Sequence, residues 1–166
     1  LYTAASTPNP SLLLDVSTYS NGATITNANI AQCSIPDLTA SATTPTSAAA
    51  GTPLTFTSTI SNIGAASTGA SFSNFFQVSS ATNGTGTNTD LAPTSMSTLA
   101  ASANAVATSP SYTFPSSGTY SVRVCADKSN SASTGSILES NENNNCGVWT
   151  DVVVSVAFNY SLSNSG

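Results

Sequence analysis

A group of carboxylates and side-chain amides in the last quarter of the chain is the strongest candidate for chemistry. It comprises Asp127, Glu139, Asn141, Glu142 and Asn144, which include three of the seven carboxylates. Hard oxygen ligands of this kind suit Ca²⁺, so the group is a candidate structural calcium site, although its spacing is not that of an EF-hand loop. We favour local hydrogen bonding as its role, because Asn and Asp side chains satisfy the backbone of tight turns. No other cofactor is expected.

Catalytic groups are scarce. The chain has no His, and therefore no imidazole base, no Ser–His pair and no His-ligated metal. Glu139 and Glu142 resemble the acid–base pair of a glycoside hydrolase, but no aromatic substrate platform lies near them in the sequence. Lys128 could activate a Ser nucleophile, yet in a chain with 31 Ser a neighbouring Ser carries no information. We expect no enzymatic activity.

The three cysteines are consistent with an oxidising compartment. Cys125 and Cys146 bracket one long connection, and a disulfide between them would contribute about 3 kcal/mol in the chain-entropy model. The alternative is a pair of free buried thiols. Cys33 is the odd cysteine: it is a candidate for an intermolecular bond, a small buried apolar residue, or a partner for either of the other two.

Two sequons are present, at Asn83 (Asn-Gly-Thr) and Asn159 (Asn-Tyr-Ser). They are glycosylation sites only in a host that modifies such sequences. Because the chain has 16 Asn, 31 Ser and 25 Thr, chance also accounts for both.

Composition restricts partners and compartment. One Lys, one Arg and a net charge of −5 leave no basic surface for nucleic acid or for an anionic membrane. The longest apolar run, residues 152–158, is too short to span a bilayer. The chain starts at Leu1 rather than Met, so we expect that a leader has been removed. These features predict an extracellular or cell-surface location.

The elements that would position these residues are β-strands. Thr, Val, Ile, Tyr and Phe recur in short runs bounded by Gly, Pro, Asn and Ser, whereas good helix formers are rare. Two strands flanking Asn21-Gly22 are predicted to form an extra N-terminal β-segment within residues 1–35. This segment is a candidate donor to another copy, and the alternative is that residues 1–30 fold back onto their own sandwich as extra strands. Residues 36–166 are predicted to form an antiparallel β-sandwich with a long last strand within 149–162. Its seven strands are expected at 38–43, 54–60, 72–78, 95–99, 111–114, 119–126 and 148–158.

Four motifs resemble the CARDB family, a cell-adhesion-related bacterial immunoglobulin-like domain. They are PDLTA at 36–40, TSTISNIG at 57–64, SGTYSVRVCAD at 117–127 and ILESNENNNC at 137–146. The resemblance covers about residues 36–156, and it implies an exported immunoglobulin-like sandwich used in surface proteins, without a defined catalytic activity. Gly118-Thr-Tyr120 also resembles the tyrosine corner of such sandwiches.

Two functions fit these expectations. The first is a structural subunit of an extracellular filament or pilus-like homopolymer, in which a terminal strand of one copy completes a sheet of the next. The candidate assembly strand is Leu12, Leu13, Leu14 and Val16. The second is a monomeric adhesion module for a host-cell or surface glycan, with a concave aromatic patch. For that patch the sequence offers only Phe72, Phe75 and Phe76, which fit the core better.

Overall fold

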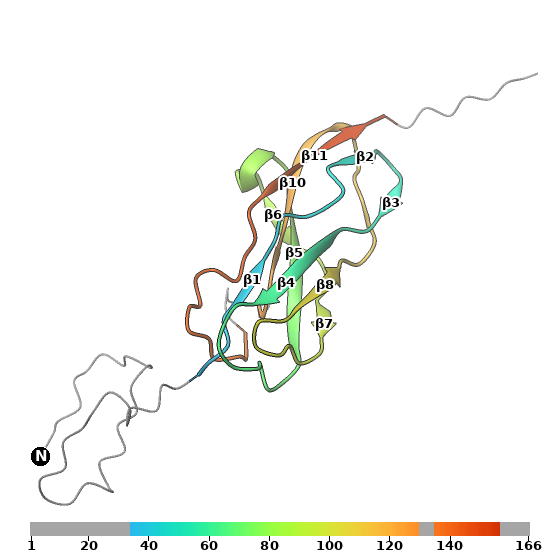
Figure 1. The fold of residues 1–166 in the computed structure, drawn as a ribbon. Helices are drawn as coiled ribbons and strands as arrows, with labels where there is room; N and C mark the ends of the chain where they lie inside the picture. Colours follow the sequence, from blue (N-terminus) through green and yellow to red (C-terminus); the bar gives the residue numbers. More distant parts are fainter. Residues whose placement is uncertain (1–33, 130–134, 157–166) are drawn as a thin grey trace, which may run out of the picture.

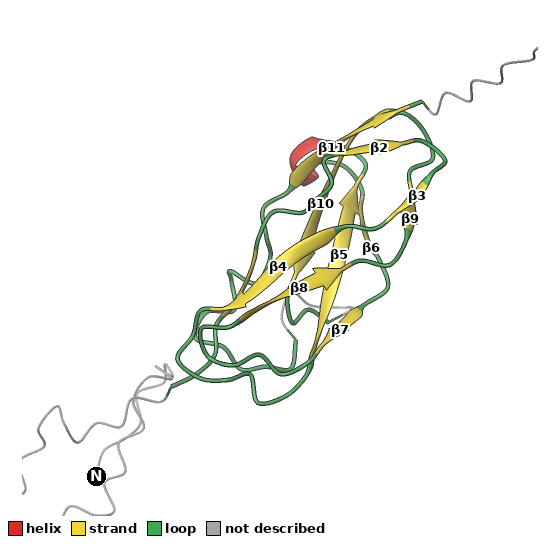
Figure 2. Cartoon of the chain, turned by 45° about the vertical axis from the view of Figure 1, so that its right-hand side comes forward, coloured by secondary structure: helices red, strands yellow, loops and turns green. Residues whose placement is uncertain are grey.

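A computed structural model of the protein describes residues 34–129 and 135–156. This part is an all-β sandwich of eleven strands with one turn of 3₁₀ helix at Thr82–Gly84. Figure 1 shows an elongated body in which the chain enters β1 at one end and leaves β11 at the other, and Figure 2 shows the same from a second direction. No helix in the described residues is long and apolar enough to cross a membrane.

One layer is an antiparallel sheet of three strands in the order β1-β4-β8, here called the first sheet. The second sheet has the order β2-β11-β10-β5-β6, and β7 also pairs with β5. All its pairs are antiparallel except β11 with β2. The first sheet contains β1 (Leu38–Ala40), β4 (Thr57–Asn62) and β8 (Asn104–Thr108). The second contains β2 (Ser47–Ala49), β5 (Phe72–Ser79), β6 (Asn88–Asp90), β7 (Thr94–Met96), β10 (Gly118–Cys125) and β11 (Thr150–Ser155).

The core lies between these sheets, because alternate residues of strands such as β4 and β11 face inward. Ile60 of β4, Val122 and Val124 of β10, and Val152 of β11 have no exposed surface. β5 lies between β10 and the β6 and β7 strands, and most of its residues are buried, Phe76 completely. A third pairing, β3 (Pro53–Leu54) with β9 (Tyr112–Thr113), closes one side.

The predicted fold class is confirmed, and so is the tyrosine corner: Tyr120 Oη donates to the Ser116 carbonyl oxygen at 3.2 Å. The predicted strand over 54–60 is wrong, because it is two strands in different sheets, β3 and β4. Three short strands, β2, β6 and β8, were not expected. Of the long stretch 149–162, the structure describes a strand of six residues, β11, and residues after 156 lie outside the described part.

Candidate functional site

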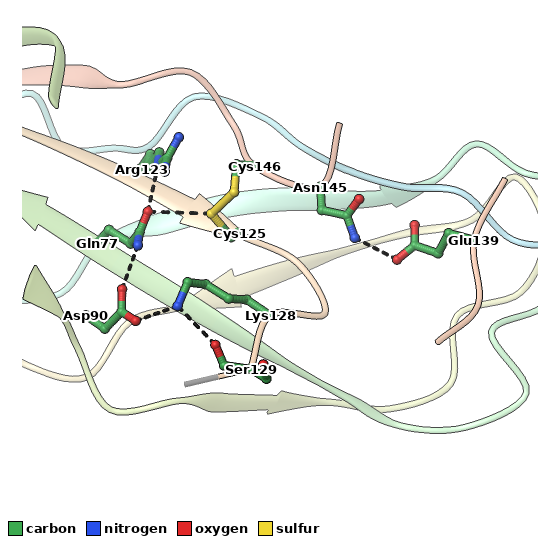
Figure 3. The surroundings of a disulfide bond; sticks show 9 residues. All are labelled: Gln77, Asp90, Arg123, Cys125, Lys128, Ser129, Glu139, Asn145 and Cys146. Atoms are coloured by element: carbon green, nitrogen blue, oxygen red, sulfur yellow. Dashed lines mark hydrogen bonds and ion pairs between the residues drawn. A yellow bond between two sulfur atoms is a disulfide. The ribbon is translucent and has the colours of Figure 1, made fainter. Parts of the chain in front are cut away.

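The frame of the site is a disulfide at the end of β10. Cys125 and Cys146 lie opposite each other as an isolated antiparallel bridge pair, and their sulfur atoms are bonded. Figure 3 shows this bond beside Gln77, Asp90 and Arg123. Ala126 N donates to the Asn145 carbonyl oxygen and Gly147 N to the Val124 carbonyl oxygen, which extends the pairing on both sides. The connection that carries the candidate carboxylates is thus closed at its base.

Glu139 connects this closed connection to β1. Its Oε2 accepts a hydrogen bond from Leu38 N, 101 residues away in sequence, and its Oε1 accepts one from Asn145 Nδ2 at 2.7 Å. The side chain is buried, with 3% of its surface exposed. Burial raises the pKa of Glu139; the two hydrogen bonds lower it, and the charges of Glu142 and Asp127 raise it again, to a value of about 7.

Neighbouring polar residues hold the same turn. Glu142 Oε1 accepts Glu139 N at 3.0 Å, and Asn141 Oδ1 accepts Asn143 N at 3.1 Å. Asp37 lies on the other side: its carboxylate accepts Ser140 Oγ and Asn144 Nδ2, both at 2.8 Å. Much of the polar cluster therefore serves the backbone hydrogen bonding that we favoured from the sequence.

Asp127 has a separate role from the rest of the predicted calcium group. Its Oδ1 accepts Ser136 N at 3.1 Å and its Oδ2 accepts Ile137 N at 2.7 Å. Its backbone is left-handed, with φ of 39°. Both carboxylate oxygens are thus occupied by the backbone. In the described residues, no group of three or more His, Cys, Asp or Glu is arranged to hold a metal ion.

The two basic side chains are engaged next to the disulfide, by Gln77 of β5 and Asp90 of β6. Lys128 Nζ lies 2.5 Å from Asp90 Oδ2 and 4.8 Å from the Phe75 ring centroid. Burial alone would raise the pKa of Asp90, but hydrogen bonds from Lys128 and Gln77 lower it below its ordinary value. Arg123 Nε donates to Gln77 Oε1 at 2.7 Å. A salt-bridged carboxylate and an engaged Lys provide neither a general acid nor a free nucleophile.

Aromatic side chains line two hollows in the described residues: Phe72 and Phe75 line one of about 470 Å³, and Tyr112 and Tyr120 line one of about 270 Å³. Phe72, Phe75 and Phe76 are all buried. Trp149 is partly exposed, and its ring lies 4.5 Å from the Arg123 guanidinium carbon. The large exposed apolar residues are aliphatic: Ile63, Val106, Leu138, Val148, Val153 and Val156.

The predicted sites at the chain ends cannot be placed in the fold. Leu12, Leu13, Leu14, Val16, Cys33 and Asn159 lie outside the described residues. Asn83 is exposed in the 3₁₀ turn, where its N–H donates to Asp151 Oδ1.

Sequence reasoning missed two members of the site, Asn145 and Asp37. Asn145 is the last residue of an Asn-rich run. The sequence of that run does not indicate which Asn side chain is buried, and in the structure Asn145 is. Asp37 contacts the site only because β1 passes beside it. In the sequence, Asp37 was singled out only as part of the PDLTA motif that resembles the CARDB family.

The fold and the site define an immunoglobulin-like β-sandwich in which a polar cluster and a disulfide stabilise the connection between Cys125 and Cys146. The CARDB family model matches residues 35–148, and the chain belongs to this family, a cell-surface and adhesion-related group of immunoglobulin-like domains. No curated protein matches the chain.

Two solved structures of one CARDB domain from Pyrococcus furiosus have a similar fold. Its crystal structure, described as in complex with di-metal ions, is 24% identical with a TM-score of 0.51 and covers 73% of this chain and 90% of that one. Its solution structure is 22% identical with a TM-score of 0.55 and covers 75% and 99%. At this identity the likeness concerns the fold alone.

Proposed function

We propose that the chain is an exported structural subunit of an extracellular filament or pilus-like polymer, assembled by adding a terminal strand of one copy to a sheet of the next. The observation that carries this proposal is the free edge of β8. β8 is the last strand of the first sheet and pairs only with β4 in the described residues. A strand edge of this kind is a template for pairing with another chain.

The backbone of β8 is oriented for such pairing. Asn62 N donates to the Ala103 carbonyl oxygen, and Ser109 N donates to the Phe56 carbonyl oxygen. In an antiparallel ladder the bonded residues alternate, so the N–H and C=O groups of Asn104, Val106 and Thr108 point away from β4. The Val106 side chain is 65% exposed. An added strand would therefore find free backbone groups and an apolar contact.

The shape of the module supports assembly along one axis. The chain enters β1 and leaves β11 at opposite ends of the sandwich (Figures 1 and 2). Near the exit, β11 runs parallel to β2, with Val153 paired to Ser47 and Ser155 to Ala49. Tension on the two ends would load these hydrogen bonds along the strands, which suits a unit in a linear array.

Strand addition in this family member would extend a sheet rather than fill a gap in the core. Leu38, Phe56, Ile60 and Phe114 are fully buried by residues of the described sandwich itself. The candidate donor remains the apolar run that includes Leu12 and Val16. Low charge, with 5% of residues charged, limits repulsion between packed copies.

The experiment compares assembly of the full chain and three variants by size-exclusion chromatography with light scattering and negative-stain microscopy. We expect fibres from the full chain, and monomers from a chain lacking residues 1–30 and from Val106→Lys, because Lys on an edge blocks strand addition. Val153→Lys is the matched control, since Val153 is 60% exposed but lies on β11, which is paired on both sides.

The alternative, a monomeric adhesion module, predicts a different pattern. A single species near 16.6 kDa for the full chain would contradict the polymer. Fibres that persist without residues 1–30 would contradict the donor strand. Removal of a leader during export is part of this proposal and is tested by the N-terminal residue of the protein isolated from its source.

A further inference from the structure

Three buried oxygen atoms in the turn before Cys146 have no hydrogen-bond donor. They are Glu142 Oε2, Asn144 Oδ1 and Asn145 Oδ1. In the described residues only one other buried side-chain polar atom lacks a partner, Asn74 Oδ1 on β5. Buried polar atoms in folded proteins are nearly always bonded. Their concentration within four consecutive residues therefore points to a partner other than the protein itself.

The orientation of the Asn145 amide is fixed by its neighbour. Its nitrogen donates to Glu139 Oε1 at 2.7 Å, and when Glu139 is ionised, turning the amide over would place its oxygen against that carboxylate oxygen. Figure 3 shows the amide with its nitrogen bonded to Glu139 and its oxygen outside that hydrogen bond. Asn145 is only 2% exposed. Its free oxygen is thus held in place inside the protein.

Glu142 is fixed in a similar way. Its Oε1 accepts Glu139 N at 3.0 Å, which leaves Oε2 buried without a donor. A cavity of about 110 Å³ is lined by Glu142, Asn143, Asn145 and Cys146. This volume exceeds the roughly 30 Å³ that a water molecule occupies in the liquid. Glu142 and Asn145 thus line one space large enough for an ion and water.

The carboxylate of Glu142 is not paired with any cationic side chain of the described residues. Glu139 and Glu142 lie three residues apart, and Glu139 N donates to the Glu142 carboxylate. The single salt bridge in the described residues joins Lys128 to Asp90, and the single Arg, Arg123, bonds Gln77. No cationic side chain of the described sandwich is left to neutralise the turn.

We propose that the cavity at Glu142 and Asn145 binds a hard divalent cation, Ca²⁺, through Glu142 Oε2 and Asn145 Oδ1. Glu139 acts as a positioning residue that turns the Asn145 oxygen toward the ion. Ca²⁺ takes six to eight oxygen ligands in adaptable geometry and completes its shell with backbone carbonyls and water, whereas Mg²⁺ demands a nearly ideal octahedron. This site differs from the group expected from the sequence, because it includes Asn145, and Glu139 positions a ligand instead of being one. It excludes Asp127, Asn141 and Asn144, none of which lines the cavity.

The test uses the full chain freed of metal with EDTA. CaCl₂ is titrated by calorimetry, and the midpoint of thermal unfolding is followed in parallel. We expect one ion per chain with a dissociation constant in the range of about 10⁻⁴ to 10⁻³ M that is typical of extracellular modules, and a midpoint that rises with Ca²⁺.

Glu142→Gln keeps the shape of the side chain and should weaken binding about tenfold or more. Asp151→Asn, a carboxylate on β11, is the matched control and should bind as the unaltered chain does.

A second measurement does not depend on any variant. Tb³⁺ bound to the unaltered chain should be displaced by Ca²⁺, and the Ca²⁺ dissociation constant obtained from this competition should agree with the calorimetry. The proposal is overturned by the absence of binding up to 10 mM Ca²⁺, roughly ten times the weakest expected constant, which would mean that water alone fills the cavity. It is also overturned by equal binding to Glu142→Gln, or by an equal effect of MgCl₂.

Discussion

The Asn145 side chain holds Glu139 across the base of a disulfide-closed connection. Asn145 Nδ2 donates to Glu139 Oε1 at 2.7 Å, and both side chains are buried. Leu38 N bonds the other carboxylate oxygen, so one carboxyl group ties β1 to the turn before Cys146. The protonation state of this carboxyl group therefore affects the free energy of unfolding.

We expect the protein to become less stable as the pH rises from about 4.5 to about 7.5. Glu139 has a folded-state pKa of about 7, above the ordinary value of 4.5 for a Glu side chain. The folded state therefore binds more protons than the unfolded state in this window, and the free energy of unfolding falls as pH increases. The full stabilising effect is present below pH 4.5 and is lost as the pH passes 7. Urea unfolding at several pH values in EDTA measures it.

Glu139→Gln is the control for this pH dependence. The amide is neutral at every pH, so most of the slope between pH 4.5 and 7.5 should disappear. The chain contains no His, so few other side chains titrate in this range. An unchanged slope in Glu139→Gln would contradict the assignment of the pH dependence to this residue.

Gly84→Ala should lower the free energy of unfolding by about 2 kcal/mol, from a left-handed backbone and an overpacked contact. Gly84 has φ of +70°, and a Cβ built there would lie 2.2 Å from Trp149 Nε1. That ring is itself held over Arg123, so it has little room to move. Chemical denaturation measures the change.

Gly51→Ala separates the two contributions. Gly51 has φ of +73°, but an added Cβ there would meet nothing within 4 Å. Gly51→Ala should therefore lower the free energy of unfolding only by the backbone strain, about 1 kcal/mol. Equal losses in the two variants would show that the Trp149 contact has no energetic effect.

The sequence predicts those strands in which apolar and polar residues alternate. β5 and β10 were found within a residue or two of their ends, because Phe76, Val122 and Val124 recur at the spacing of an inward face. β2 and β6 were not found, because SAA and NTD have no such pattern and become strands only by pairing with β11 and β5.

The break between β3 and β4 also depends on distant partners. Leu54 pairs with Tyr112 of β9, while Ser109 N donates to the Phe56 carbonyl oxygen and Phe56 N donates to Ser109 Oγ. Nothing in residues 54–57 marks the change of sheet. The site follows the same rule: the turn chemistry of Asn141 is local and predictable, but the contact of Glu139 with Leu38 spans 101 residues.

Removing the disulfide should lower the free energy of unfolding by about 3 kcal/mol, because the bond closes a loop with a sequence separation of 21 residues. The comparison is Cys125→Ala with Cys146→Ala, both in a Cys33→Ala background so that intermolecular bonds do not contribute. Urea unfolding with and without a phosphine reductant measures the loss. The reductant should destabilise the Cys33→Ala chain and leave the triple variant unchanged.

The same bond sets how far one module extends under tension. Pulling on the ends of the oxidised chain cannot straighten the residues between Cys125 and Cys146, since the bond carries the force past them. Reduction should add about 70 Å to the unfolded contour length, from about 3.4 Å for each released residue. Single-molecule force spectroscopy measures the difference. An equal contour length in both redox states would mean that the bond does not form in the folded protein. The added length would show that the disulfide shields the polar turn from a load applied to the ends of the chain.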